Sequence, residues 1–278
     1  MEYSNRYSTK TFFIKRFRRT VVPFLLWSMV AMFYCYMSNK QAYDWTMLGI
    51  VKGIITYRYM DIYWFFMPLF VVYLSMPVLT LLKNNLKIMG YMAVYALVTI
   101  SFSSFVAKLG YNCSLLQSLV TPVSAGFLLY PLIGYLLHKI DIAKRWRWVI
   151  YFLGAMCAIL HCVLTIFLTP EDGAIWTKFK GYLLLPNVLY SASIFLFFKY
   201  NSYVLCRFRR LMKIINFIQP TTLGIYLIHM YFLALYENLG LNYGRLYYRT
   251  LGPVITFVLC ALFVWLCRKT RLGRLLFS

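Results

Sequence analysis

The sequence has little charge and very few acidic residues. Only 13% of its 278 residues are charged, with 7 acidic residues against 29 basic ones, whereas a soluble domain averages roughly 25% charged residues. Hydrophobic residues make up 62% of the chain, which excludes disorder because disordered chains are poor in apolar residues. A soluble nucleic-acid-binding protein could carry a net charge of +22, but it would also need a polar surface. This chain has too few charged residues for one, so no nucleic-acid partner is expected. The composition predicts a multi-pass membrane protein whose charges lie outside the hydrocarbon.

Common catalytic motifs are also lacking. The chain holds no Walker loop, no dinucleotide-binding glycine pattern, no GxSxG elbow and no HExxH zinc motif. No two cysteines have the CxxC spacing, so we expect neither a disulfide framework nor a metal site. No charge lies in mid-span, which argues against ion-coupled transport. The loops are too short for a soluble catalytic domain, so any chemistry must use the helices and their short connections.

The chain instead contains long uncharged stretches. A transmembrane helix needs about 20 mostly apolar residues, and eight stretches free of Lys, Arg, Asp and Glu approach or meet that length. They are continuous rather than alternating, which excludes transmembrane strands. The predicted fold is an all-α, polytopic bundle of eight transmembrane helices in a single membrane domain over residues 1–278. The predicted spans are Val21–Ser38, Ile62–Leu82, Ile88–Ala107, Leu119–Leu137, Trp148–Leu168, Gly181–Phe198, Thr221–Tyr236 and Leu251–Cys267.

The basic residues are distributed unevenly between the loops. If the N-terminus is cytoplasmic and the sides alternate, 21 of the 29 basic residues fall on the inner side. Cytoplasmic loops of membrane proteins carry such an excess of Lys and Arg. The pattern predicts that both termini are cytoplasmic. It also supports the number of spans, because a missed span would invert every later loop.

A basic cluster precedes the first predicted span. Arg16 and Arg19 are three residues apart, so they share one face if the segment is helical. Pro23 suits the first turn of the following helix, where a missing N–H costs nothing. Two interpretations remain open. The cluster can bind membrane lipid through anionic head groups, or the two guanidinium groups can bind phosphate oxygens bidentately.

Two histidines lie within the predicted spans, and one aspartate lies at the end of a span. His229 lies within the seventh span, where an ionisable side chain is expensive and is a functional candidate by default. Imidazole can also act as a general base near neutral pH. His161 lies within the fifth span and can simply hydrogen-bond a neighbouring group. Asp61 opens the second span at its outer boundary, where a helix N-terminus favours a carboxylate.

Four segments together resemble the acyltransferase-3 family, the integral membrane acyltransferases that modify bacterial surface sugars. The resemblance is strongest to the polysaccharide O-acetyltransferase branch, and it covers nearly the whole chain. The segments are an Arg-x-x-Arg motif at Arg16–Arg19 that leads into a span, a Trp-Phe…Tyr-Leu…Pro pattern over residues 64–77, a Leu-Pro-Asn-Val-Leu…Phe-Leu-Phe-Phe-Lys stretch over 185–199, and a Gly-x-Tyr-Leu-x-His motif over 224–229.

The resemblance implies a function and a set of site residues. Arg16 and Arg19 would hold the phosphates of an acyl-CoA donor, expected to be acetyl-CoA, at the cytoplasmic face. The acyl group would pass to a hydroxyl of a surface glycan or of a polyprenyl-linked sugar, in the bacterial cytoplasmic membrane and without a metal. His229 is the candidate catalytic base. Trp64, Tyr226 and Asp61 are candidates for the substrate path.

The chain also departs from the family pattern. The family core has ten spans, and the Arg-x-x-Arg segment follows the second of them. The resemblance therefore implies that the first two spans are lacking here, together with a histidine that the family uses in acyl transfer, and His229 stands as its substitute. The chain is expected to be a truncated product, a partial gene model or a divergent member. Two alternative functions stay open, a transporter or flippase of a lipid-linked sugar and an inactive truncated acyltransferase.

Overall fold

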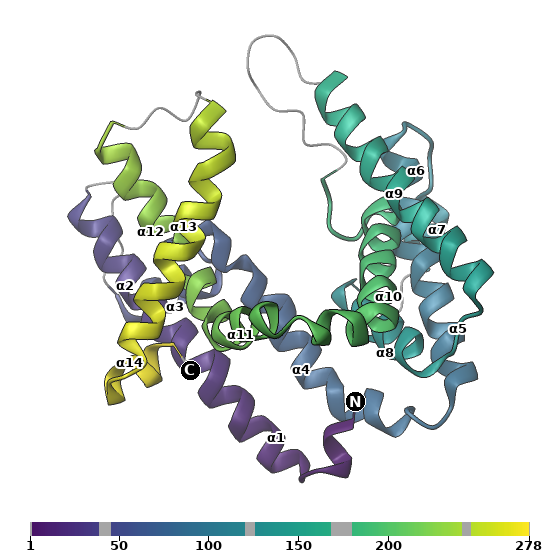
Figure 1. Cartoon of the computed structure of the whole chain (residues 1–278), viewed down its shortest axis with the longest axis horizontal. Coiled ribbons are helices and arrows are strands. Elements are labelled where there is room, and N and C mark those ends of the chain that lie inside the picture. The colour runs from purple at the N-terminus through teal and green to yellow at the C-terminus, as the bar shows by residue number, and fades with distance from the viewer. Residues whose placement is uncertain (1, 39–45, 120–125, 168–179, 241–245, 278) are drawn as a thin grey trace. The chain divides into compact units, whose positions relative to one another are not determined.

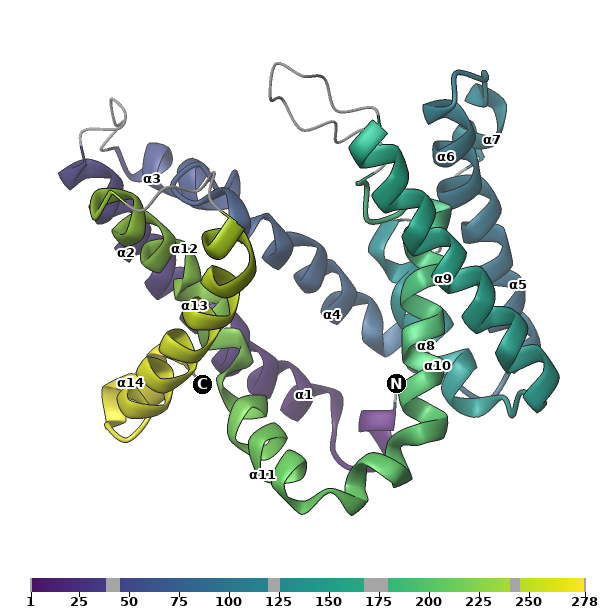
Figure 2. The same cartoon turned by 45° about the horizontal axis from the view of Figure 1, so that its top comes forward.

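Most of the chain is helical in the part that its computed structural model describes, which is residues 2–38, 46–119, 126–167, 180–240 and 246–277. These residues form no strand, which confirms the predicted all-α class. The chain divides into two compact units (Figures 1 and 2). Unit 1 comprises Met1–Arg6 and Pro68–Arg207, and unit 2 comprises Tyr7–Met67 and Phe208–Ser278. The single domain over residues 1–278 stays a prediction.

Six helical stretches within the described residues are long and apolar enough to cross a membrane, and each coincides with one predicted span. They confirm the prediction of several apolar membrane helices. The number of spans and the side of each terminus stay predictions. The six stretches are Thr9–Met37, Asp61–Leu81, Leu86–Lys108, Lys144–Phe167, Arg209–Asn238 and Thr250–Cys267.

The other two predicted spans look different in the structure. Within Leu119–Leu137, residues 120–125 lie outside the described part, and helix α8 begins only at Leu129. Helix α10 (Leu185–Arg207), which contains most of the predicted span Gly181–Phe198, is long enough but carries polar residues such as Asn187 and Lys199. Neither therefore combines the length and the apolar character of the six others.

Unit 2 packs its helices around aromatic side chains. Tyr63, Phe66 and Phe277 are almost fully buried, and the rings of Phe24 and Phe66 lie 4.8 Å apart between centroids. A Cβ atom added to Gly224 would lie 2.6 Å from Val264 Cγ1, so α12 and α13 approach closely there. The elements are α1 (Thr9–Arg16), η2 (Phe17–Val21), α2 (Val22–Met37), α3 (Met47–Ile55), η3 (Asp61–Phe65), the start of α4 (Phe66–Leu81), α11 (Arg209–Ile218), η6 (Gln219–Thr221), α12 (Thr222–Asn238), α13 (Leu246–Cys267) and α14 (Arg271–Leu276).

Unit 1 has an aliphatic core between α5 and α8. Met89 on α5 and Leu132 on α8 are fully buried and belong to one cluster with Leu79. Lys199 on α10 donates to the carbonyl oxygens of Leu137 and Ile140, both at 2.8 Å, and so satisfies the C-terminus of α8. The elements are η1 (Glu2–Asn5), most of α4, α5 (Leu86–Ala96), η4 (Leu97–Phe102), α6 (Ser103–Lys108), α7 (Ser114–Ser118), η5 (Gly126–Leu128), α8 (Leu129–Lys139), α9 (Lys144–Phe167) and α10 (Leu185–Arg207).

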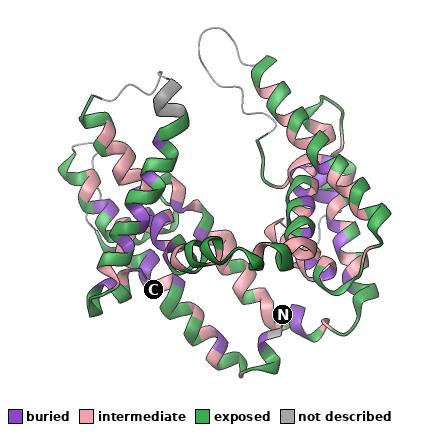
Figure 3. Cartoon of the chain, in the orientation of Figure 1, coloured by how far each residue is buried: buried purple, intermediate pink, exposed green. Residues whose placement is uncertain are grey.

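Large apolar side chains lie exposed along helices of both units. Figure 3 shows in green how much of these helices is exposed. On α9, only 6% of the apolar stretch is buried. A soluble protein rarely exposes so much contiguous apolar surface, whereas a helix in contact with lipid tails requires it. The burial pattern therefore fits a membrane protein.

Candidate functional site

The basic N-terminal segment contains a widened helical turn. Residues Phe17–Val21 form a π turn between α1 and α2, in which the Val22 N–H bonds to the Phe17 carbonyl. Pro23 explains the turn, because proline has no N–H and its ring clashes with the carbonyl four residues earlier, here that of Arg19. Thr20 Oγ1 donates to the Arg16 carbonyl at 2.6 Å and further stabilises this turn. The predicted helix is present, and its start lies well before the predicted start of the span.

Arg16 and Arg19 line one pocket of unit 2, which we call the arginine pocket. Its volume is about 700 Å³. The walls come from the N-terminal helix, from the segment that joins α11 to α12, and from the residue that follows α13. The residues that line it are Arg16, Arg19, Thr20, Asn216, Gln219, Pro220, Thr222, Leu223 and Arg268.

Arg268 is the member of this pocket that the sequence did not single out. Its guanidinium donates to the Pro220 carbonyl, so the chain after α13 is tied to the start of α12. The sequence signal was only its place among the basic residues that the charge pattern predicts to be cytoplasmic. Three guanidinium groups line the pocket, and no acidic residue is among its described lining residues. Such a surface attracts multiply charged anions, and guanidinium binds phosphate oxygens in pairs.

His229 lies on α12, and one of its ring nitrogens is hydrogen-bonded to the backbone of the same helix. Its Nδ1 lies 2.8 Å from the Tyr226 carbonyl oxygen and 3.2 Å from that of Ile225. A carbonyl can only accept, so we infer that Nδ1 carries the proton in the neutral ring and that Nε2 keeps a lone pair. The side chain is half-buried. This tautomer is the one that a general base acting through Nε2 requires.

Two tyrosines cross-connect η3 and α12 beside this histidine. The Tyr226 hydroxyl donates to the Ile62 carbonyl, and the Tyr63 hydroxyl donates to the Leu227 carbonyl at 3.0 Å. The ring centroids of Tyr226 and His229 lie 5.8 Å apart. The two hydrogen bonds hold the backbone around His229 against η3, so Tyr226 positions this segment.

Asp61 lines a second pocket of unit 2, which we call the Asp61 pocket. Its volume is about 450 Å³, and it contains two carboxylates and one guanidinium. The residues that line it are Tyr34, Cys35, Arg58, Tyr59, Met60, Asp61, Ile62, Met230, Leu233, Ala234 and Glu237. Carboxylates and a guanidinium together offer acceptors and donors for the hydroxyl groups of a polar ligand.

Helix α12 connects the two pockets. Leu223 lines the arginine pocket, and Met230 lines the Asp61 pocket. His229 follows Leu223 by six residues, which is about 9 Å along a helix axis. The structure thus brings Arg16 and Arg19 together at one pocket and Asp61 to the other. Trp64 is half-buried beside Phe65, at 6.3 Å between ring centroids, and is not among the residues described as lining either pocket.

Comparison with known proteins gives one match. Residues 1–267 match the family model described as an acyltransferase domain. No curated protein and no solved structure matches the chain. Within the described part of the chain, no group of three or more His, Cys, Asp or Glu side chains is placed to hold a metal ion.

Proposed function

The chain belongs to the acyltransferase-3 family of membrane acyltransferases, and from that premise we propose that it transfers an acyl group from acyl-CoA to a hydroxyl of a glycan. Acetyl-CoA is the proposed donor. The proposed acceptor is a cell-surface polysaccharide or its polyprenyl-linked precursor, at the bacterial cytoplasmic membrane. One observation carries this proposal, namely that Arg16, Arg19 and Arg268 line one pocket at the start of the helix that bears His229.

The donor site in this proposal is the arginine pocket. Coenzyme A carries several phosphate groups, and the pocket offers three guanidinium groups from two separate segments of unit 2. Phosphate bound by paired N–H donors is held in a defined orientation. The predicted topology puts this pocket at the cytoplasmic face, where acyl-CoA is available. The acyl end of the donor would then extend along α12 towards His229.

The acceptor site in this proposal is the Asp61 pocket. It lies at the far half of α12 and, by the predicted topology, at the outer face. Asp61 and Glu237 would accept hydrogen bonds from sugar hydroxyl groups, and Arg58 would donate to ring or hydroxyl oxygens. Because both substrates would be held beside one helix, their reaction would become effectively unimolecular, which lowers its activation barrier.

The chemistry requires one base. His229 Nε2 takes the proton from the acceptor hydroxyl while that oxygen attacks the thioester carbonyl carbon. The new C–O ester bond forms, the C–S bond breaks, and the thiolate of coenzyme A leaves and takes the proton. The Nδ1–H donates to the Tyr226 carbonyl at 2.8 Å, which stabilises the imidazolium formed in between. The histidine returns to its neutral tautomer after each turnover.

Donor binding tests the first half of this proposal. The purified full chain is titrated with acetyl-CoA, and the double variant Arg16→Ala/Arg19→Ala is compared with Arg18→Ala. Arg18 belongs to the same basic cluster but is not among the described lining residues, so it controls for the loss of one positive charge from this cluster. We expect the double variant to bind about a hundredfold more weakly or worse, because charge-assisted hydrogen bonds contribute roughly 1.5–3 kcal/mol each and the variant removes the donors of two arginines. Unchanged binding in the double variant would refute the phosphate-binding role.

Acyl transfer tests the second half. Cells lacking the chain are analysed for the length of their surface glycan and for its ester-linked acyl groups. A glycan of normal length without these esters is the result expected of a transferase. Loss of glycan export with normal esterification of the remaining polymer would instead support a transporter of the lipid-linked sugar. Esters restored by the wild-type chain but not by Arg16→Ala/Arg19→Ala would connect the donor pocket to the reaction.

A further inference from the structure

His161 of unit 1 has a buried ring nitrogen that lacks a partner. Its Nε2 atom is shielded from solvent, and it makes no hydrogen bond with any residue that the structure describes. The residue lies on α9, a helix that is otherwise apolar and largely exposed to the surroundings. An imidazole nitrogen buried without a partner is costly, and an ionisable residue in a span points to a binding site.

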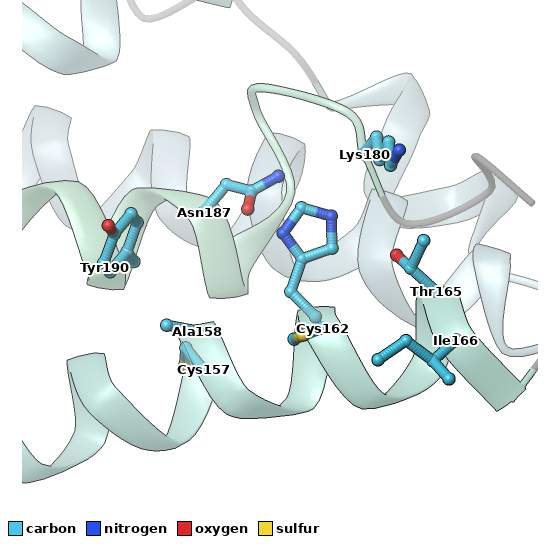
Figure 4. A pocket seen from close by; sticks show the side chains of 9 residues that line it. Cys157, Ala158, Cys162, Thr165, Ile166, Lys180, Asn187 and Tyr190 are labelled. Carbon is cyan, nitrogen blue, oxygen red and sulfur yellow. The ribbon is translucent and has the colours of Figure 1, made fainter. Parts of the chain in front are cut away.

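The helices α9 and α10 create a cavity around this nitrogen. A Cβ atom added to Gly154 would lie 2.0 Å from Ser193 Oγ, so the two helices touch closely at that level. About two turns further along α9, they leave a cavity of about 330 Å³. Figure 4 shows Asn187 and Tyr190 on one side of it, and Cys157 and Thr165 on the other. We call this cavity the His161 pocket.

The walls of the His161 pocket are mostly apolar, with neutral hydrogen-bonding groups set among them. His161, Thr165, Asn187 and Tyr190 contribute an imidazole, a hydroxyl, an amide and a phenol. Asn187 Nδ2 donates to the Gly181 carbonyl at 2.7 Å, which fixes this side chain at the start of α10. Apolar walls with a few placed polar groups, in a volume near 300 Å³, are typical of a small-molecule site.

We propose that the His161 pocket binds a neutral sugar unit of the glycan acceptor, as a subsite separate from the two pockets of unit 2. A sugar hydroxyl both donates and accepts, so it suits His161 Nε2 in either tautomer and suits the other neutral groups. The carbon face of the sugar ring suits the apolar walls. The proposal that this pocket binds a sugar is argued from its lining residues. It rests on the proposed function only where it identifies that sugar as part of the acceptor.

Other ligand classes fit the pocket less well. A phosphate group prefers guanidinium, and Lys180, which is exposed, is the only cation among the described lining residues. A metal ion would need a third ligand, and the described residues provide no such cluster. A lipid tail would leave the imidazole nitrogen without a hydrogen bond. The predicted topology puts the pocket towards the outer face, where a surface glycan is present.

The test measures sugar binding by the purified full chain without any donor. The chain is placed in lipid nanodiscs free of glycolipid and of maltoside detergent, since such detergents carry a sugar. Saturation-transfer NMR then follows neutral methyl glycosides of glucose, galactose, rhamnose and N-acetylglucosamine. We expect transfer to at least one of them, and binding about fivefold or more weaker in His161→Leu. His138→Leu provides the matched control, because it makes the same change at an exposed histidine of unit 1.

A second pocket variant and a competition experiment complete the test. Ala158 lines the pocket, and Ala158→Phe fills it while keeping His161, so this variant decides the question if His161→Leu does not fold. Inorganic phosphate is the competitor that tests for an anion site. The subsite is refuted if no glycoside receives saturation, if both pocket variants bind like His138→Leu, or if phosphate displaces the glycoside.

The outcome is separable from that of the proposed function. Acetyl-CoA binding is measured on the same preparations, where it depends on the arginine pocket. Glycoside binding that needs His161 in a chain without acetyl-CoA binding would keep the subsite and count against the proposed transferase. Acetyl-CoA binding without any glycoside binding would keep the donor site and refute the subsite.

Discussion

The Nδ1 atom of His229 lies 2.8 Å from the backbone carbonyl oxygen of Tyr226, in the preceding turn of the same helix. This contact assigns the proton of the neutral ring to Nδ1 and leaves the Nε2 lone pair available. Within unit 2, the same helix borders the arginine pocket at its start and the Asp61 pocket further along. The arrangement gives His229 the tautomer of a base between two candidate substrate sites.

Replacement of His229 should therefore abolish transfer without affecting the donor. We expect His229→Ala to lower the rate of acyl transfer about a hundredfold to ten-thousandfold, the usual contribution of a general base. The dissociation constant for acetyl-CoA should stay within about twofold, because the arginine pocket does not use this side chain. Single-turnover transfer and equilibrium binding are measured on the same protein. A variant that transfers at the wild-type rate would show that His229 is not the base.

Arg268 should contribute to donor binding although it lies far from Arg16 in the sequence. We expect Arg268→Ala to weaken acetyl-CoA binding about threefold to tenfold, a partial loss because the guanidinium is half-buried and screened by solvent. The control is Arg271→Ala, which removes an exposed arginine of α14 that is not among the described lining residues of the pocket. Equal binding by the two variants would exclude Arg268 from the donor site.

The crossed tyrosine hydrogen bonds should stabilise unit 2. Tyr63→Phe and Tyr226→Phe each remove one hydroxyl that donates to a backbone carbonyl. We expect each variant to lose about 1 kcal/mol of unfolding free energy, measured as thermal stability in detergent. Tyr203→Phe removes a hydroxyl from an exposed ring of unit 1 and should change nothing. If all three variants melt at the wild-type temperature, the hydrogen bonds contribute little.

Gly224 should be sensitive to the smallest side chain. A Cβ atom there would lie 2.6 Å from Val264 Cγ1 and 2.8 Å from Phe277 Cδ1. Overpacking of this kind costs about 1–3 kcal/mol, so Gly224→Ala should lower the melting temperature. At Gly90 on α5 a Cβ would meet nothing within 4 Å, so Gly90→Ala should be neutral or stabilising by up to about 1 kcal/mol. The opposite order of the two variants would contradict the close packing of α12 on α13.

The sequence predicts well those elements that depend only on properties of a short stretch of chain. Length, hydropathy and charge identify the six stretches that meet the criteria for a membrane helix. The same properties predict two further spans, but there the helices are short or polar. The helix that contains the first predicted span begins earlier than the span, at Thr9, because its basic first half is charged but still helical. The π turn was not predicted, although Pro23 is a local cause for it.

The site was predictable only where its residues are neighbours in the sequence. Arg16 and Arg19 follow from their spacing, and His229 follows from its place in an apolar stretch. Arg268 was missed because its contact with Pro220 joins two helices. The surroundings of His161 were also missed, since Asn187 and Tyr190 lie on another helix. The spacing of residues along a helix shows which of them share one side of that helix, but it does not show which residues of other helices pack against that side.

The number of spans decides on which side the His161 pocket lies. With eight spans, Ala143 is cytoplasmic and Lys180 is external; if only the six stretches that meet both criteria cross the membrane, the two positions exchange sides. We expect eight, because that arrangement places 21 of 29 basic residues inside. Ala143→Cys and Lys180→Cys are introduced one at a time after replacing the 7 native cysteines. A membrane-impermeant maleimide should label Lys180→Cys on intact cells and Ala143→Cys only after permeabilisation. The reverse pattern would contradict eight spans from a cytoplasmic N-terminus and would move the His161 pocket to the cytoplasmic side, away from any surface glycan.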